Sequence, residues 1–346
     1  MAAILEWFYA TSDGRLCMSY GGGSRWASGP LGFQTAPAVT EGVRKVWAGT
    51  AGGDLITFDA LTGDIVRTVS LGAAVFYTAC HGPNLIVALA DGQVFAIDPA
   101  SEGVRWRSQV DGKVLSADET NNVLVLQAFE GPAAVAIDSV GGATLWTTPY
   151  AGPAVAADDG IAYISSFNNT LEARRASDGA VLWSKAGLPY NFPGLNAYEG
   201  VLYAGTEGET VEAITGPTGI AQWSSSASGF PGRPLLAQPD GGAGASLIVG
   251  FGNTGAAPSP GISGYNAGTG EQLWVTGPLS TDTGDQPIFP LTRLYRGCVG
   301  VPGEGLVYFY DLNGQPAWSP EQPWNPGQQL DGLAYLGGEI GAWPQP

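Results

Sequence analysis

Histidine, cysteine and lysine are all scarce in this sequence of 346 residues. The one histidine, His81, excludes metal sites built from several histidines, and we interpret it as a turn residue. The three cysteines, Cys17, Cys80 and Cys298, are too far apart and too few for a disulfide framework. Each lies in a strand-like run, so we expect buried free thiols.

Basic residues are outnumbered by acidic ones, 14 against 31, which gives a net charge of −17. Such a surface repels phosphate backbones, so we expect no nucleic-acid binding. No apolar run approaches the roughly 20 residues that span a bilayer, so we expect no membrane insertion. No charged-then-apolar leader precedes the first expected strand. We therefore expect a cytoplasmic protein, or a secreted or periplasmic one if a signal peptide has been removed.

The common catalytic motifs are also missing. The sequence contains no Gly-x-Ser-x-Gly elbow and no phosphate-binding Gly-Lys loop. No helical periodicity persists anywhere, which favours an all-β chain.

Glycine and tryptophan, by contrast, are plentiful, with 53 and 11 residues. Tryptophan follows glycine by four residues in a repeated frame, and two further units are near-matches. From Trp106 onward the tryptophans of the frame are 37 to 51 residues apart. Spacings near 40 residues are typical of four-stranded propeller blades. The pairs in the frame are Gly22–Trp26, Gly142–Trp146, Gly179–Trp183, Gly219–Trp223, Gly270–Trp274 and Gly314–Trp318; the near-matches are Gly103–Trp106 and Gly63–Arg67, where arginine takes the tryptophan position.

Each unit has a simple physical interpretation. An alternating run such as Val94–Asp98 predicts a half-buried strand that ends in a carboxylate. That carboxylate can accept hydrogen bonds from the backbone amides of the turn, and the glycine permits positive φ. The tryptophan ends the next strand, where its ring can pack between neighbouring sheets while its N–H donates to a carbonyl.

The motif Ala-x-Asp-x-x-(Thr/Ser)-Gly-x-x-x-Trp resembles the repeat of the pyrroloquinoline-quinone-like, or quinoprotein, β-propellers. Asn266–Trp274 is the clearest match and Asp59–Gly63 the next. The family includes dehydrogenases, outer-membrane assembly lipoproteins and sensor-kinase ectodomains. Its dehydrogenases hold calcium or a lanthanide beside the quinone, and many stack a disulfide of adjacent cysteines on it. This chain has no adjacent cysteines and few basic residues that could bind the three carboxylates of the quinone, Arg233 being the best single candidate. We therefore expect no cofactor, including PQQ with calcium, and no metal.

We therefore predict an all-β, eight-bladed propeller of four-stranded antiparallel blades, with seven blades as the fallback. The N-terminal strands lack an inner partner, which residues 329–336, with a continuation to Trp343, can supply, so the termini are expected to share one blade and close the ring. The chain is expected to be one domain and a monomer. The predicted blades are residues 1–28 with 327–343, 32–72, 73–112, 113–150, 151–187, 188–228, 229–278 and 283–319.

Two insertions, at residues 251–260 and 279–290, are expected at the same rim, where loops between the second and third strands and links between blades emerge. Binding loops of repeat proteins concentrate on one face. The links at this rim are rich in aromatic and amide side chains that suit a small organic ligand or a peptide. The ligand-binding candidates are Phe76, Tyr77, Tyr150, Tyr190, Asn191, Phe192, Phe230, Arg233, Gln286 and Trp324, and the catalytic candidates are Asp282 and Asp285.

Two classes of function remain open. The first is a non-catalytic propeller that binds a small molecule or a protein segment at the loop-rich face. The alternative is an enzyme that uses an aromatic-lined funnel on a hydrophobic substrate, as a cyclase, lyase or isomerase would. A quinone- or metal-dependent oxidoreductase is a third and less favoured hypothesis. Unpaired carboxylates in an aromatic pocket would favour the enzyme, and paired carboxylates would favour binding.

Overall fold

The computed structural model describes most of the chain up to residue 276 and, beyond it, the backbone of strands only. The regular elements named in the described part are all β-strands, and they form eight antiparallel sheets. The described residues are 5–11, 14–20, 23–40, 43–129, 134–149, 154–166, 169–186, 190–237, 245–252, 261–276, 292–295, 298–303, 306–311, 316–318 and 335–342.

The first four sheets in chain order share one meander pattern, in which sequential strands pair with one another. They comprise β1 (Leu5–Thr11), β2 (Leu16–Tyr20) and β3 (Gly23–Ala27) with β33 (Tyr335–Ala342); β4 (Ala38–Thr40), β5 (Lys45–Gly49), β6 (Asp54–Asp59) and β7 (Ile65–Ser70); β8 (Val75–His81), β9 (Asn84–Leu89), β10 (Gln93–Ile97) and β11 (Val104–Gln109); and β12 (Lys113–Thr120), β13 (Val123–Phe129), β14 (Ala134–Asp138) and β15 (Thr144–Thr148).

The other four sheets repeat the pattern, except that one of them splits its first strand into two short pieces. They comprise β16 (Val155–Asp158), β17 (Ile161–Ser166), β18 (Thr170–Arg175) and β19 (Val181–Ala186); β20 (Tyr190–Tyr198), β21 (Val201–Thr206), β22 (Thr210–Thr215) and β23 (Ala221–Ser226); β24 (Phe230–Pro231), β25 (Leu235–Ala237), β26 (Ser246–Gly252), β27 (Gly261–Asn266) and β28 (Gln272–Thr276); and β29 (Thr292–Tyr295), β30 (Cys298–Gly303), β31 (Leu306–Asp311) and β32 (Pro316–Trp318).

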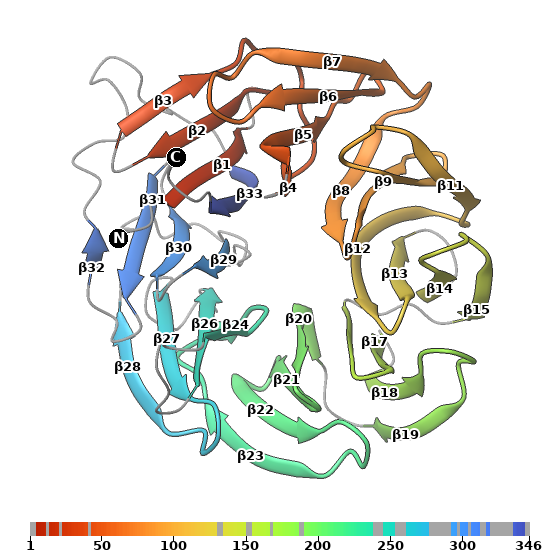
Figure 1. Cartoon of the computed structure of the whole chain (residues 1–346). Coiled ribbons are helices and arrows are strands. Elements are labelled where there is room, and N and C mark those ends of the chain that lie inside the picture. The colour runs from red at the N-terminus through yellow and green to blue at the C-terminus, as the bar shows by residue number, and fades with distance from the viewer. Residues whose placement is uncertain are drawn as a thin grey trace.

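The sheets are arranged around a common centre, with the first strand of each on the inside, except that β33 takes this place in the sheet of β1, β2 and β3 (Figure 1). Neighbouring inner strands contact one another in the order β33, β4, β8, β12, β16, β20, β24 with β25, β29 and again β33. Strand β33 pairs antiparallel with β1, so the two ends of the chain meet in one sheet. The strand expected at residues 329–336 is placed later, at β33, and residues 329–334 lie outside the described part.

Tryptophan side chains join neighbouring sheets in the same way at five places. Each indole Nε1 donates to a backbone carbonyl in the first turn after the third strand of the next sheet. Each ring also lies against the glycine of that turn; a Cβ at Gly142 would stand 2.8 Å from the ring of Trp106. The donor and acceptor pairs are Trp26–Ala60, Trp106–Ser139, Trp146–Ala176, Trp183–Gly216 and Trp223–Ala267.

The turn that receives the indole is built as the sequence predicts. Asp59 Oδ1 accepts from two amides of its turn, Leu61 N at 2.9 Å and Thr62 N at 3.0 Å. The glycine four residues after the carboxylate position, Gly63, has a φ of 74°. In every sheet the third and fourth strands also shift register next to the tryptophan position, as at Ala96, which pairs with Trp106. A bulge there increases the local twist.

One seam lacks the indole. At the tryptophan position of β7, Arg67 Nη1 instead donates to Glu102 Oε2 at 3.1 Å, and Lys45 pairs with the other oxygen of Glu102. Glu102 occupies the place of the turn glycine and adopts a φ of 56°. Burial raises the pKa of Glu102, but the hydrogen bonds and charges of Lys45 and Arg67 outweigh this effect and hold it below its ordinary value. An ion pair thus replaces an indole between these two sheets.

The apolar core lies between sheets, in clusters that each draw on neighbouring sheets. One cluster packs Phe8 and Met18 against Val46 and Phe58, with Trp26 at its margin. Outer strands such as β7 are largely exposed, while β9 is buried along its whole length. Of the cysteines with described side chains, Cys17 is buried and Cys80 is partly buried, and neither forms a disulfide.

Candidate functional site

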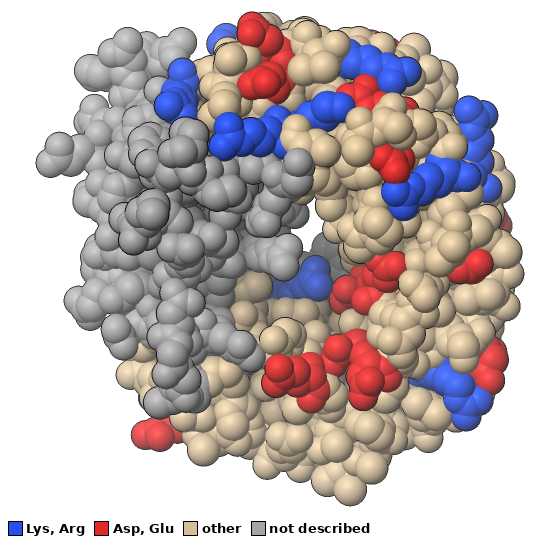
Figure 2. Space-filling model, in the orientation of Figure 1, with Lys and Arg blue, Asp and Glu red and all other residues tan. Residues whose placement is uncertain are grey.

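The opening at the common centre of the sheets contains an ion pair between sheets that are not neighbours. Arg233 lies between β24 and β25, and its Nη2 stands 3.7 Å from Oδ2 of Asp118 on β12. In the order of inner strands, β16 and β20 stand between these two elements. The Arg233 side chain therefore reaches a sheet that is not adjacent to its own, on the inner side of the strands. Figure 2 shows the opening, with basic and acidic side chains close together at its margin.

The backbone that carries Arg233 is fixed on both sides. Gly232 N donates to Gly250 O at 2.7 Å, and Pro234 O accepts from Asn196 Nδ2, on β20, at 2.9 Å. Pro231 and Pro234 are both buried, and the rings of these prolines restrict φ. The guanidinium is thus presented by a rigid element, although its own side chain is 39% exposed.

Asp118 is held by its backbone surroundings as well as by Arg233. Its Oδ2 accepts from Ala157 N on β16 at 3.0 Å, and its Oδ1 accepts from Glu119 N at 3.0 Å. Burial raises the pKa of the Asp118 carboxyl, and the charge of Arg233 acts in the opposite direction. The negative charge of Asp158 on β16 adds to the rise. Asp118 and Asp158 are therefore close enough for their charges to interact.

His81 and Tyr77 lie beside this ion pair. Both belong to β8, and His81 Nε2 is 2.9 Å from the Tyr77 hydroxyl, with the rings stacked at 6.3 Å between centroids. Burial, and to a smaller extent the charge of Arg233, lowers the pKa of His81 to about 4. His81 is therefore neutral at physiological pH. We call Arg233, Asp118, His81 and Tyr77 the channel cluster.

The other inner-strand carboxylates nearby are also engaged. Asp158 Oδ2 accepts from Gly200 N at 2.7 Å. Glu119 Oε1 accepts from the Ser139 hydroxyl. Since hydrogen bonds to the ionised form stabilise it, these carboxylates act as connectors between sheets rather than as free acids or bases.

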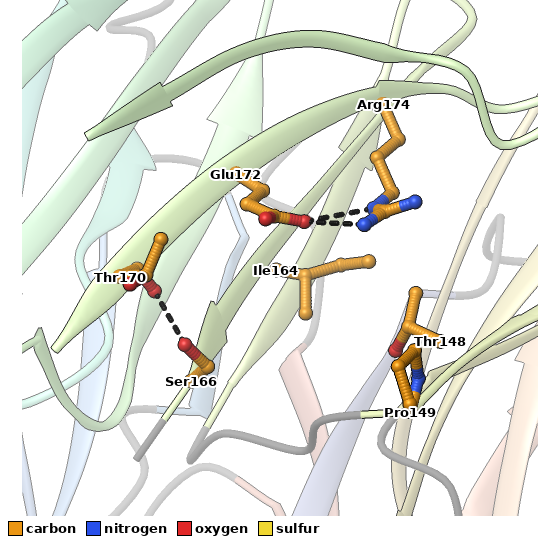
Figure 3. Close-up of a pocket in the computed structure, with 7 residues that line it drawn as sticks. All are labelled: Thr148, Pro149, Ile164, Ser166, Thr170, Glu172 and Arg174. Carbon is orange, nitrogen blue, oxygen red and sulfur yellow. Dashed lines mark hydrogen bonds and ion pairs between the residues drawn. The ribbon is translucent and has the colours of Figure 1, made fainter. Parts of the chain in front are cut away.

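A second hollow, of about 220 Å³, lies between the β12–β15 sheet and the β16–β19 sheet (Figure 3). Glu172 and Arg174 form an ion pair along its wall, with Arg174 Nη2 2.6 Å from Glu172 Oε2. Arg174 Nη1 also donates to Gly179 O, so the pair is tied to the turn of its own sheet. The lining is Thr148, Pro149, Ile164, Ser166, Thr170, Glu172 and Arg174. It includes the start of a link between sheets and a loop between second and third strands, which is the rim that the sequence identifies.

Of the residues predicted to bind a ligand, three have described side chains. Tyr77 and Arg233 come together in the channel cluster, whereas Phe76 is exposed, with Lys113 Nζ 5.7 Å from its ring centroid. Strands contain Tyr190, Asn191, Phe192 and Phe230, but their side chains lie outside the described part. Tyr150, Gln286, Trp324, Asp282, Asp285 and the insertions at 253–260 and 279–290 also lie outside it.

Sequence reasoning missed Asp118, the position of His81, and the pair Glu172–Arg174. His81 is the last residue of the inner strand β8 rather than a turn residue, and it takes part in the cluster because β8 ends beside Arg233. Asp118 lies on the inner strand β12, and no spacing along the sequence links it to Arg233.

No group of three or more histidine, cysteine or acidic side chains that could hold a metal occurs within the described residues. In the same part of the chain, no helix is long and apolar enough to cross a membrane.

The chain matches one family model over residues 51–149 and 130–314, well over half of its length; this model, PQQ_2, is described as outer membrane protein assembly factor BamB. The crystal structure of BamB from Moraxella catarrhalis is 18% identical, with 89% of this chain and 82% of that one covered and a TM-score of 0.46. The crystal structure of the computationally designed Ika8 protein is 16% identical, with 83% and 87% covered and a TM-score of 0.63, a likeness of fold alone. No curated protein matches the chain. The resemblance to PQQ-like β-propellers that the repeat predicts is thus confirmed, and the chain belongs to the family described as outer membrane protein assembly factor BamB.

Proposed function

We propose that this protein is a non-catalytic β-propeller that binds an extended segment of a partner protein at its loop-rich face. The observation that carries the proposal is the state of the inner-strand carboxylates. Asp118, Asp158 and Glu119 each accept a hydrogen bond from a backbone amide or a hydroxyl of the protein itself. General acid–base catalysis needs a group that can exchange a proton with a substrate, and these three are committed to structural contacts.

We further propose that the eight sheets are the blades of one closed ring. The succession of contacts between inner strands and the pairing of β33 with β1 support this arrangement. The indole contacts, which join neighbouring sheets at five seams, are consistent with it. A closed ring leaves only short, protected strand edges around its centre, so binding falls to the loops and the opening.

The partner class follows from the family. Its description names an outer membrane protein assembly factor, which is a role in assembling other proteins. We therefore infer a protein partner rather than a metabolite, and a location outside the cytoplasm, in the periplasm. The small-molecule alternative would rely on the hollow beside Glu172 and Arg174, whose charged groups already pair with each other.

Site-specific photo-crosslinking in cells tests this proposal. A crosslinking amino acid replaces Phe76, which is 38% exposed where β8 begins, at the loop-rich face; the control replaces Val66, which is 53% exposed on the outer strand β7. We expect one partner to crosslink from position 76 and not from position 66, and the purified partner to bind with a Kd of about 1 µM or tighter.

Equal crosslinking from both positions would contradict a specific face. A retained metabolite that the purified protein converts to a product would favour the enzyme alternative instead.

A further inference from the structure

We propose that the central opening binds a carboxylate carried on the partner segment, with Arg233 as its anchor. This inference rests on the proposed function and adds the chemistry of what enters the ring. It assigns to the channel cluster a role in recognising the partner segment, a role that the fold alone does not require.

The Arg233 guanidinium has unused hydrogen-bond donors. Its ion pair with Asp118 measures 3.7 Å, longer than a hydrogen bond, and no hydrogen bond of this side chain is found in the described structure. A guanidinium offers five N–H donors in a fixed fork that matches the two oxygens of a carboxylate. An incoming carboxylate can therefore bind without breaking any hydrogen bond of Arg233.

Asp118 does not depend on Arg233 for its own hydrogen bonds. Both of its oxygens already accept backbone amides, from Ala157 and Glu119. If a ligand takes the guanidinium, Asp118 keeps those two bonds and loses only a long-range attraction. The exchange is therefore not opposed by leaving a buried carboxylate without a partner.

The surroundings select the kind of anion. Asp118 and Asp158 repel negative charge, so a group with a single charge is tolerated better than a phosphate, which carries more. The protein as a whole has a net charge of −17, so free anions are repelled as well. A carboxylate at the end or on the side of a segment that other contacts hold overcomes this repulsion. Neutral His81 and the Tyr77 hydroxyl stand close enough to line the same space.

Calorimetric titration with three probes tests the inference: tetraglycine acetylated at its N-terminus with a free C-terminal carboxylate, the same peptide as its C-terminal amide, and succinate. We expect the free-acid peptide to bind at least tenfold more tightly than the amide, since one charged bidentate contact separates them. Binding of succinate as tight as that of the peptide would identify a site for free small carboxylates. That result would overturn the assignment to a segment.

Three variants then locate the contact. Arg233→Gln should lose the preference for the free acid, and Asp118→Asn should strengthen its binding about threefold to tenfold because a like charge is removed. Arg107→Gln is the matched control; Arg107 lies on the outer strand β11, over the ring of Phe95. Circular dichroism confirms that each variant folds. No binding of any probe up to about 10 mM, or an unchanged preference in Arg233→Gln, overturns the inference.

The two proposals fail separately. If the Arg233→Gln variant still crosslinks to the partner from position 76 with wild-type affinity, the carboxylate contact is wrong and partner binding stands. If the partner itself is absent while the free-acid peptide binds, the opening recognises carboxylates but the proposed function is wrong.

Discussion

An arginine and a glutamate stand where an indole and a glycine meet at five other seams, and exchanging the two pairs predicts a measurable gain in stability. The perturbation is the double variant Arg67→Trp with Glu102→Gly. By the register of the other seams, the indole Nε1 at position 67 would donate to the carbonyl of Pro99, the residue after the turn carboxylate Asp98.

The single changes should each destabilise. Arg67→Trp alone places a ring against the Glu102 side chain, where at Gly142 even a Cβ would stand only 2.8 Å from an indole, so we expect a loss of about 1–3 kcal/mol. Glu102→Gly alone leaves Lys45 and Arg67 without their partner. It also removes the cost of about 1 kcal/mol that a side chain has at positive φ, so the net loss is about 1 kcal/mol or less.

The double variant combines both gains. The ring packs on glycine, a hydrogen bond worth about 1 kcal/mol forms, and the strain at position 102 disappears. We expect the two changes to couple favourably by about 2 kcal/mol in a double-mutant cycle measured by urea denaturation. The reverse exchange, Trp146→Arg with Gly179→Glu, is the control and should destabilise the protein. It removes the indole contact of Trp146 at a seam that has no lysine in the position of Lys45.

Additive effects of the two changes on the free energy of unfolding would refute the reasoning. Each substitution alone should destabilise the protein, and only the two together should form the indole contact. A wild-type protein whose stability resists 1 M salt as well as the double variant does would also count against an ion-pair seam, because salt of about that strength screens exposed pairs.

Three further predictions follow from single residues. Gly142→Ala, at a φ of 79° and against Trp106, should cost about 2–4 kcal/mol in urea denaturation, whereas Gly72→Ala, at a φ of 90° with open space around it, should cost only about 1 kcal/mol. His81 has a folded pKa of about 4, below its unfolded value of 6.5, so its contribution to stability is complete above pH 6.5 and is lost as the pH falls toward 4. The variant His81→Gln should therefore reduce the loss of stability between pH 6.5 and pH 4 by up to about 3 kcal/mol. An unchanged profile of stability against pH would contradict the lowered pKa of His81. Arg233→Ala should leave the midpoint of urea unfolding nearly unchanged, since the guanidinium makes no hydrogen bond; a large loss would make Arg233 a structural residue.

The fold was predictable because its rule is local and repeated. Asp59 and Gly63, four residues apart, set a turn through hydrogen bonds within the turn, and Asp138 and Gly142 repeat that spacing. The sequence also shows that Arg67 and the shifted Gly103 depart from the repeat. It does not connect those two departures, because the contact between Arg67 and Glu102 joins separate sheets.

The channel cluster was predictable only in part. Arg233 and Tyr77 stand out as polar or aromatic residues of inner strands, but Asp118 and His81 have no local signal of a shared site. Their proximity depends on how the sheets, which are arranged around a common centre, turn their inner strands toward it. That geometry is a property of all the blades together, and no spacing along the chain encodes it.

Arg67 and Arg233 both depart from the repeat, but they differ in a way that bears on function. Arg67 departs from the indole rule, and Glu102 departs with it, so that each charge has a partner and the seam is complete. Arg233 also places a charge where the repeat requires none, yet its guanidinium makes no hydrogen bond within the described residues, and both oxygens of Asp118 accept backbone amides without it. A local exception that is compensated serves the fold, whereas one that is not compensated tends to mark a functional site. By this criterion Arg233, rather than Arg67, is the arginine that binds a group from outside the chain.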